Sequence, residues 1–312
     1  MIDLGNPIAT PFRAQWAVKP RTDFEFRTDV FTAADGTEQR RPKNRYPSVK
    51  IRYQCLARDA QHADRITRMM PVLMTSALAV RDFRLGGYGL VSQDGRTIQI
   101  RSWLSSWAVG VRVIVEDDYG LNEHTAVVSA VDAAARTITL DAPAPETMCG
   151  RWAGVASAVV ASLDGDLVSE RQHAGAVTWD VVATSFRGLD QIGGAPLGVF
   201  PFRHGADAPV RVTSSRSVIG VDFGTGRRLE VPGYASGTSG FRTSQIEGRQ
   251  MSQSAKEALV SFFCGCRGRW RAFDAPDLAP GARFRFASDI LTMTHDSAAV
   301  SSATMNLAQV IR

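Results

Sequence analysis

The pair Cys264-Gly-Cys266 is the sharpest candidate for chemistry in this chain of 312 residues. Two thiols one residue apart could share a metal ion, but zinc needs about four ligands, and the other cysteines, Cys55 and Cys149, are isolated. A redox dithiol more usually has the spacing Cys-x-x-Cys. Because a free cysteine packs as a small hydrophobic residue, we expect Cys264 and Cys266 to fill space at a helix end, and we predict no metal site and no cofactor.

Two groups of carboxylates could bind calcium. Glu116, Asp117 and Asp118 are consecutive, and Asp164 and Asp166 flank a glycine. Neither group has the spacing of a calcium-binding EF-hand loop, and a hard cation needs more oxygen ligands than either supplies. We therefore expect both to be solvated turns.

The residues that could serve nucleophilic catalysis lack its sequence patterns. Ser239 lies in Gly237-Thr-Ser-Gly240, which is not the Gly-x-Ser-x-Gly turn that exposes a nucleophile. The five histidines are scattered, and we interpret His295 as a surface residue at a strand end rather than a general base. These patterns favour a protein that is not an enzyme, and a metal or redox enzyme stays the least favoured alternative.

Trp103 and Trp107 are four residues apart and could form a shelf on which a sugar ring stacks. The same spacing suits a packed junction between domains, which we prefer, since large amphipathic side chains serve in both settings. The shelf and the glycine- and proline-rich loop 187–209 keep a carbohydrate- or receptor-binding module open as the alternative function.

Two similar strand–loop–helix units stand near the two ends of the chain. In the first, a strand from Val49 to Cys55 precedes a helix from about Asp59 to Met74. Apolar residues recur in this helix at three- and four-residue spacing, and Pro71 should kink or end it. Whether the two units are duplicated copies is left open.

The second unit carries the clearest helix signal. Ser254-Ala-Lys-Glu257 has the form of a capping box, which places the helix from about Ala255 to Cys266. Its expected apolar face consists of Ala255, Leu259, Phe262, Phe263 and Cys266. Strands are expected at 283–286, 290–295 and 303–310.

The whole chain is predicted to be mainly β (α+β), with sandwich- or barrel-like modules, two short amphipathic helices and an inserted small β-barrel. Residues 1–23 are expected to be an extended arm that lies on a neighbouring subunit. The expected divisions after the arm are a first strand–helix unit at 24–96, a barrel-like insertion at 97–150, a β-rich middle at 151–232 that contains the loop 187–209, and a second strand–helix unit at 233–312.

Composition is ordinary for a globular protein, with 44% hydrophobic and 21% charged residues. No apolar run approaches the roughly 20 residues that span a bilayer, and the start lacks a signal-peptide pattern, so we expect no membrane partner and synthesis in the cytoplasm. The net charge of +5 comes from interspersed charges without a nucleic-acid-binding motif. Arginine-rich turns therefore favour protein interfaces over nucleic acid.

Three stretches resemble distal tail and tail-tip (baseplate) proteins of long-tailed bacteriophages and of gene transfer agents. They are Arg27-Thr-Asp-Val30 with Asp35-Gly-Thr-Glu-Gln-Arg40, then Ala258-Leu-Val-Ser-Phe-Phe263 with Arg267-Gly-Arg-Trp-Arg-Ala-Phe273-Asp274, and Phe286-Ala-Ser-Asp289-Ile-Leu291. Together they cover about a third of the chain. The chain differs from that family in its length, in the inserted barrel, and in the distance between its Glu-Gln-Arg unit and its Phe-Phe helix.

The resemblance implies a structural protein of the virion tail that forms a ring between the tail tube and the tip or fibres. Its partners would be copies of itself and other tail proteins (tube, hub, tip or fibres). Because a ring needs opposite faces that complement one another, charged and aromatic turns are the expected contact points. The expected interface residues are Glu38, Arg40, Arg267, Arg269 and Trp270.

Overall fold

The computed structural model describes residues 7–10, 12, 14–32, 38–57, 59–101, 107–117, 123–165, 167–171, 176–185, 198–201, 210–215, 218–222, 228–232, 241–297 and 300–310. Within them the fold is mainly β with two α-helices, as predicted. The predicted loop 187–209 and Ser239 lie largely or wholly outside the described residues. Neither described helix is long and apolar enough to cross a membrane.

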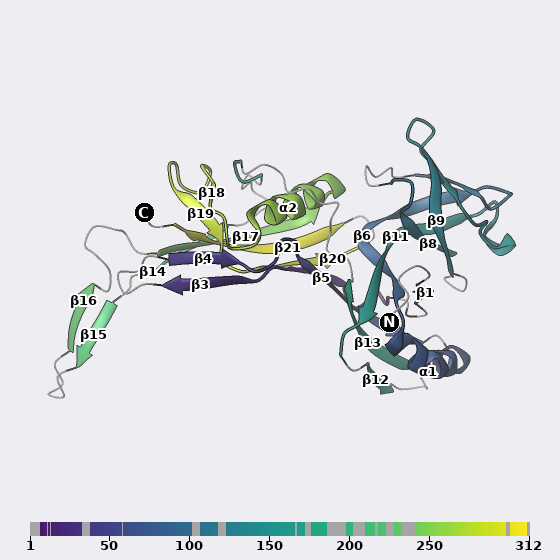
Figure 1. The fold of residues 1–312 in the computed structure, drawn as a ribbon, viewed down its shortest axis with the longest axis horizontal. Coiled ribbons are helices and arrows are strands. Elements are labelled where there is room, and N and C mark those ends of the chain that lie inside the picture. The colour runs from purple at the N-terminus through teal and green to yellow at the C-terminus, as the bar shows by residue number, and fades with distance from the viewer. Residues whose placement is uncertain are drawn as a thin grey trace.

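Most strands join one large sheet (Figure 1). Its strands are β1 (Ile8–Ala9), β2 (Arg21–Glu25), β5 (Ser48–Leu56), β6 (Leu78–Val91), β7 (Thr97–Ile100), β8 (Arg112–Asp117), β9 (Glu123–Asp132), β10 (Thr137–Leu140), β11 (Trp152–Leu163), β12 (Val168–Arg171), β13 (Val177–Ser185), β14 (Val210–Ser215), β17 (Phe241–Met251), β18 (Phe273–Asp274), β19 (Arg283–Phe286), β20 (Ile290–His295) and β21 (Ser301–Gln309). A single 3-10 turn, η1 (Glu146–Met148), follows β10.

The order across this sheet mixes the two ends of the chain. It runs β14, β17, β21, β20, β2, β5, β13, β11, β6 and β1, with antiparallel neighbours throughout except for the parallel pair β6–β1. Strand β2 thus joins the first strand–helix unit to the second. The two units are parts of one continuous sheet.

Two hairpins form separate two-stranded sheets: β3 (Thr28–Thr32) with β4 (Glu38–Pro42), and β15 (Val218–Asp222) with β16 (Arg228–Pro232). In Figure 1 the β15–β16 hairpin projects beyond the left end of the main sheet, past β14.

Helix α1 (Ala60–Thr75) begins at Asp59, whose side chain accepts a hydrogen bond from the His62 backbone N–H. The predicted helix is confirmed, but Pro71 does not end it, because the helix continues to Thr75. Only Ile66 and Leu73 are buried among its residues, so α1 is a surface helix.

Helix α2 (Gln253–Cys266) lies against the main sheet beside β17 and β21 (Figure 1). The predicted N-cap is wrong by two residues. The Ser252 side chain, and not that of Ser254, accepts a hydrogen bond from the Ala255 N–H. Glu257 instead accepts from the Gln253 side chain. Seven of its residues are buried: Lys256, Leu259, Val260, Phe262, Phe263, Cys264 and Cys266.

Six strands close into a small barrel with its own core. The pairings run β6–β7–β10–β9–β8–β11 and return to β6, so no strand edge is left open. The first half of β6 belongs to the main sheet and the second half to the barrel. In the barrel half of β6, a Cβ on Gly89 would lie 2.4 Å from the Ile98 Cγ2 atom, so a larger residue would force its neighbours to move.

The described residues of the N-terminal segment lie on this chain's own sheet, whereas the sequence analysis expected an arm on a neighbouring subunit. Ile8 pairs with Leu78, and the Gln15 N–H donates to the Gln54 carbonyl. Phe12 is buried in the main core. This correction has a simple cause, because β6, which the sequence analysis did not predict, offers a free edge for β1.

Candidate functional site

Asp289 joins the two end units of the chain. Its carboxylate accepts from the Thr28 N–H and hydroxyl at 2.9 and 3.0 Å, and from the Arg269 N–H and Nε at 3.0 and 3.1 Å. Gly268, at φ +63°, passes over this carboxylate, where a Cβ would lie 2.6 Å from an Asp289 oxygen. The Arg269 Nη2 also donates to the Thr28 carbonyl. The base of the β3–β4 hairpin is thereby fixed to the turn after α2.

Two more predicted interface residues complete this cluster within the chain. Arg40 donates from Nε and Nη2 to one oxygen of Glu38 and from Nη1 to the Arg269 carbonyl. Arg285 reaches the same Glu38 oxygen at 3.5 Å. Glu38, Arg40 and Arg269, which the sequence analysis expected at an interface, therefore position the hairpin within one subunit.

Arg267 and Trp270, also expected at an interface, lie in the turn that follows α2. The Arg267 and Arg271 guanidinium carbons lie 4.9 and 4.6 Å from the centre of the Trp270 ring. We call these three half-buried residues the cationic turn. Among the described residues, neither of its arginines forms a salt bridge with a carboxylate.

Cys264 and Cys266 lie in the main core, as the packing interpretation predicts. Burial raises the pKa of each thiol to about 12, which disfavours the thiolate that metals and disulfides require. Beside them, Phe262 and Phe263 join an aromatic cluster that includes Phe200. Phe200 anchors the few described residues of the long loop.

The proposed sugar shelf is not available in this structure. Trp107 is 5% exposed and belongs to the barrel core, so its ring faces cannot stack on a ligand. Trp103 lies outside the described residues. The preferred alternative, packing, holds for Trp107.

A network of buried polar groups lies between α2 and the sheet. Residues 82–85 of β6 bulge out opposite Ser157 of β11 and leave the ladder. Asp82 pairs with Arg84 in this bulge, and the Lys256 Nζ donates to the Arg84 carbonyl at 3.3 Å. Desolvation lowers the pKa of Lys256 to about 8. The buried lysine thus satisfies a carbonyl that the bulge removes from the sheet.

His295 is a second correction, because it is fully buried where a surface position was expected. Its Nε2 contacts the Thr22 hydroxyl at 2.9 Å and its Nδ1 contacts the Ser301 hydroxyl at 2.8 Å. Desolvation lowers its pKa to about 4, and Lys256 contributes in the same direction. A neutral imidazole between two hydroxyls has a structural role here, since its hydrogen bonds connect β20 to β2 and β21.

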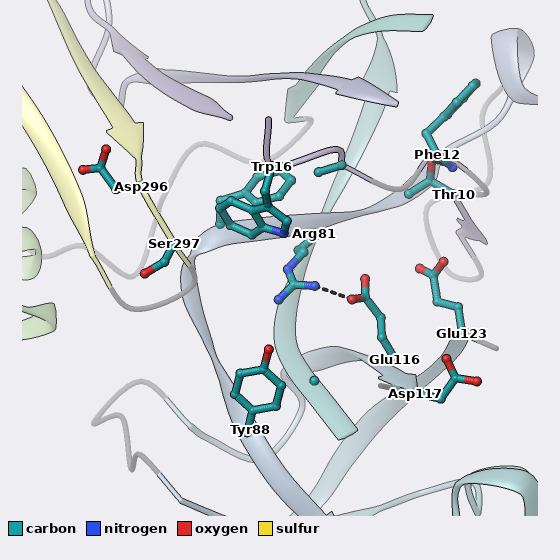
Figure 2. A pocket seen from close by; sticks show the side chains of 13 residues that line it. Thr10, Phe12, Trp16, Arg81, Tyr88, Glu116, Asp117, Glu123, Asp296 and Ser297 are labelled. Atoms are coloured by element: carbon teal, nitrogen blue, oxygen red, sulfur yellow. Dashed lines mark hydrogen bonds and ion pairs between the residues drawn. The ribbon is translucent and has the colours of Figure 1, made fainter. Parts of the chain in front are cut away.

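A pocket of about 470 Å³ opens where the barrel meets the main sheet (Figure 2). Figure 2 shows Arg81 of β6 at its centre, between Trp16 and Tyr88. The Arg81 Nη1 lies 2.5 Å from the Glu116 Oε2, and the Arg81 guanidinium carbon lies 6.0 Å from the Phe83 ring. We call this feature the junction pocket.

The junction pocket is acidic. Among the described residues, its lining contains one guanidinium and four carboxylates, of which Glu116 is paired with Arg81 and Asp296 with Lys19; the other two are Asp117 and Glu123. Glu116 and Glu123 are directly opposite each other on β8 and β9, a pairing of like charges that disfavours the sheet unless cations compensate. Desolvation raises the pKa of the nearby Tyr53, and the negative charges of Glu123 and Glu116 raise it further. Glu116 and Asp117 therefore line a pocket in place of the solvated turn expected for them, while Asp118 lies outside the described residues.

Sequence reasoning did not find the residues that shape this pocket. Trp16, Arg81 and Tyr88 are distant in sequence and carry no shared motif. The only signal was the run of acidic residues at the end of β8. Among the described residues, no group of three or more histidine, cysteine or carboxylate side chains is arranged to hold a metal ion.

Comparison of the chain with protein-family models and with curated proteins gives no match.

Proposed function

We propose that this chain is a structural subunit of a bacteriophage tail tip or distal tail, where copies of it form a ring between the tail tube and the tip or fibres. The observation that carries the proposal is the pair of two-stranded hairpins, β3–β4 and β15–β16, which join no third strand within the described residues. A lone two-stranded hairpin is marginally stable in water, so both hairpins would gain from packing on a neighbour.

The β3–β4 hairpin supports this role in more detail. Its base is held by Asp289 and Arg269, whereas Phe31 on β3 is 61% exposed. A hairpin that is held at its base and exposes an aromatic side chain is suited to contact another subunit. The sequence resemblance described above points to the same class of protein.

Cryo-electron microscopy of the purified particle tests the proposal. It should find the chain in several copies related by rotation about the tail axis. Absence of the chain from the virion would contradict the proposal.

A variant sharpens the test. Phe31→Ser should weaken association about tenfold or more without lowering thermal stability, because an exposed aromatic anchor is lost. Val168 on β12 is equally exposed, at 61%, and Val168→Ser serves as the matched control. Equal association of both variants and the wild type would exclude the hairpin as a contact.

A further inference from the structure

Two exposed aromatic side chains are neighbours on the outer face of the barrel. Tyr88 on β6 is 55% exposed, and Trp152 on β11 is 45% exposed. Tyr88 pairs with Gly154, and Trp152 comes two residues before Gly154 on the same strand, so the two aromatic residues share one face of the sheet. Such diagonal neighbours are about 7–8 Å apart, which is within reach of aromatic side chains. The two rings therefore lie side by side on one surface.

Gly154 keeps this surface open beside the Tyr88 ring. It has no side chain, and the nearest atoms to an added Cβ would belong to Glu116, at 3.8 Å or more. Leu90 pairs with Trp152 and is half-buried, so it forms an apolar floor next to the Trp152 ring. We call Tyr88, Leu90, Trp152 and Gly154 the barrel shelf.

Two polar side chains border the barrel shelf on the side of β7. Gln99 pairs with Leu90, and the Arg101 N–H donates to the Tyr88 carbonyl. Both side chains are exposed, and among the described residues neither has a hydrogen-bond or ion-pair partner. An amide and a guanidinium supply several donors and one acceptor beside the rings. Aromatic faces with a few polar groups around them are typical of sites for small polar ligands.

The barrel shelf continues into the junction pocket, because Tyr88 and Gly154 also line that pocket. Figure 2 shows Trp16 across the pocket from Tyr88, with Arg81 between them. The charges of Arg81 and Glu116 neutralise each other, and the pair still offers N–H donors and carboxylate lone pairs to hydroxyl groups. The volume of about 470 Å³ lies within the range of small-molecule sites. The pocket therefore suits a neutral ligand that carries hydroxyl groups.

A carbohydrate fits the barrel shelf better than a protein does. An aromatic side chain contributes at most about 150–250 Å² of contact area, and both rings of the shelf are already partly covered. A specific protein interface buries about 1,000 Å² or more. A hexose ring of gluco configuration carries C–H bonds on its two faces and hydroxyl groups around its rim. Its faces can stack on the rings while its hydroxyl groups bond to Gln99 and Arg101.

We propose that the barrel shelf and the junction pocket together bind gluco-configured hexose units of a polysaccharide. Trp152 and Tyr88 stack on the sugar rings, and the polar side chains beside them bind the hydroxyl groups. This site differs from the shelf expected at Trp103 and Trp107. It does not depend on the proposed ring assembly, because all its residues belong to one subunit.

Isothermal titration calorimetry of the full-length protein with cellohexaose and with chitohexaose tests the proposal. At least one of them should bind with a dissociation constant below about 1 mM. Trp152→Ala and Tyr88→Ala should each weaken this binding about tenfold or more, with little change in melting temperature, because each removes an exposed stacking ring. Absence of binding of both oligosaccharides to the wild type at about 10 mM would overturn the proposal.

Gly154→Val is an independent variant, because it removes neither a ring nor a polar group. The position has room for a Cβ, and valine is favoured in strands, so the melting temperature should not fall. The added side chain would occupy the open surface beside Tyr88 and should weaken sugar binding about tenfold. Val109→Ala is the matched control, since Val109 is 66% exposed in the turn before β8, outside the shelf, and should bind like wild type.

Analytical ultracentrifugation separates this site from ring assembly. The three shelf variants should self-associate like the wild type. Weaker self-association of Trp152→Ala with unchanged sugar binding would overturn the proposal and assign the barrel shelf to a contact between subunits. Absence of sugar binding in a wild type that assembles normally would also overturn it, and would leave the proposed function standing.

Discussion

The units β5–α1 and β17–α2 have the same order of elements but opposite environments. Helix α1 buries two of its 16 residues, whereas α2 buries seven of 14, among them a lysine and two cysteines. Both helices begin with a side-chain cap and carry an apolar face. Local signals therefore specify a helix in each case. The packing of other elements around the helix decides whether it lies on the surface or in the core.

The difference agrees with the contacts of the two helices, because α2 connects more parts of the fold than α1 does. It packs against β17 and β6, contacts the β6 bulge through Lys256, and ends in the turn bonded to Asp289. Helix α1 packs near β11 and contributes no residue to the described lining of the junction pocket or to the cationic turn. The following experiments separate the two environments, starting with the largest expected effect.

Shortening an apolar side chain should lower the unfolding free energy far more in α2 than in α1. Phe263 is 1% exposed and meets Phe286 edge-on at 4.9 Å, so Phe263→Ala should cost about 3–5 kcal/mol of unfolding free energy. Val72 on α1 is 49% exposed, and Val72→Ala should change stability by less than about 0.5 kcal/mol. Urea denaturation followed by circular dichroism measures both, and equal effects would refute the contrast.

The buried His295 should make the sheet under α2 sensitive to acid. Its pKa is about 4 when folded and 6.5 when unfolded, so the unfolded state binds more protons between these values. Stability from the neutral imidazole is therefore complete above pH 6.5 and is lost as pH falls, by up to about 2.5 kcal/mol at pH 4.5. Asp82, Arg84, Lys256 and Asp296 supply the surrounding charge.

His295→Gln provides the reference for this measurement. The difference in unfolding free energy between wild type and variant should shrink from pH 7 to pH 4.5 in urea titrations. A difference that is constant with pH would show that the imidazole is not buried in its neutral form.

Lys256 should make α2 sensitive to pH in the same direction as His295, but in the alkaline range. Its folded pKa, about 8, lies below the ordinary 10.5 because burial disfavours the cation. Since the unfolded state binds more protons between pH 8 and 10.5, the penalty of the buried cation is relieved as pH rises through that range. Wild type should therefore gain stability relative to Lys256→Met from pH 7.5 to 10. A loss over this range would contradict the burial of the charge.

The helix caps should give the smallest effects. Asp59 accepts from His62 at 2.7 Å, and Asp59→Ala should cost about 1 kcal/mol. Ser252 accepts from Ala255 at a longer 3.3 Å, with the Ser254 hydroxyl 3.1 Å away as a substitute, so Ser252→Ala should cost about 0.5 kcal/mol. Hydrogen exchange should localise the first change to α1. A larger cost at Ser252 would show that its cap is not replaceable.

Local patterns predicted most elements because short-range physics specifies them. Alternation of apolar residues predicted strands β5, β19 and β20, and three- and four-residue spacing predicted both helices. The small barrel was expected from regular short strands and turns, yet two of its six strands, β6 and β11, lie entirely outside the predicted range 97–150. Strand β6 was missed because buried Asp82 and Arg84 and several glycines interrupt its apolar pattern.

The positions of charged and polar groups depended on contacts between distant parts of the chain. Cys264 and Cys266 were predicted to pack, since nothing in their sequence neighbourhood could complete a metal site. By contrast, His295 is buried where Thr22 and Ser301 meet it across strands, and Glu38 and Arg40 contact Arg285 and Arg269 only because the hairpin folds back beside them. Thr22, Arg285 and Arg269 lie more than 200 residues from the side chains that they contact, and such pairs leave no local pattern.

The sequence by itself determined a mainly β chain with two capped amphipathic helices, because propensity, capping and periodicity act over a few residues. Only the tertiary structure decided that the two end units share one sheet, that Lys256 is buried, and that an acidic pocket opens beside the barrel. These features follow from strand order and from the β6 bulge, which are set by the packing of segments that the sequence separates.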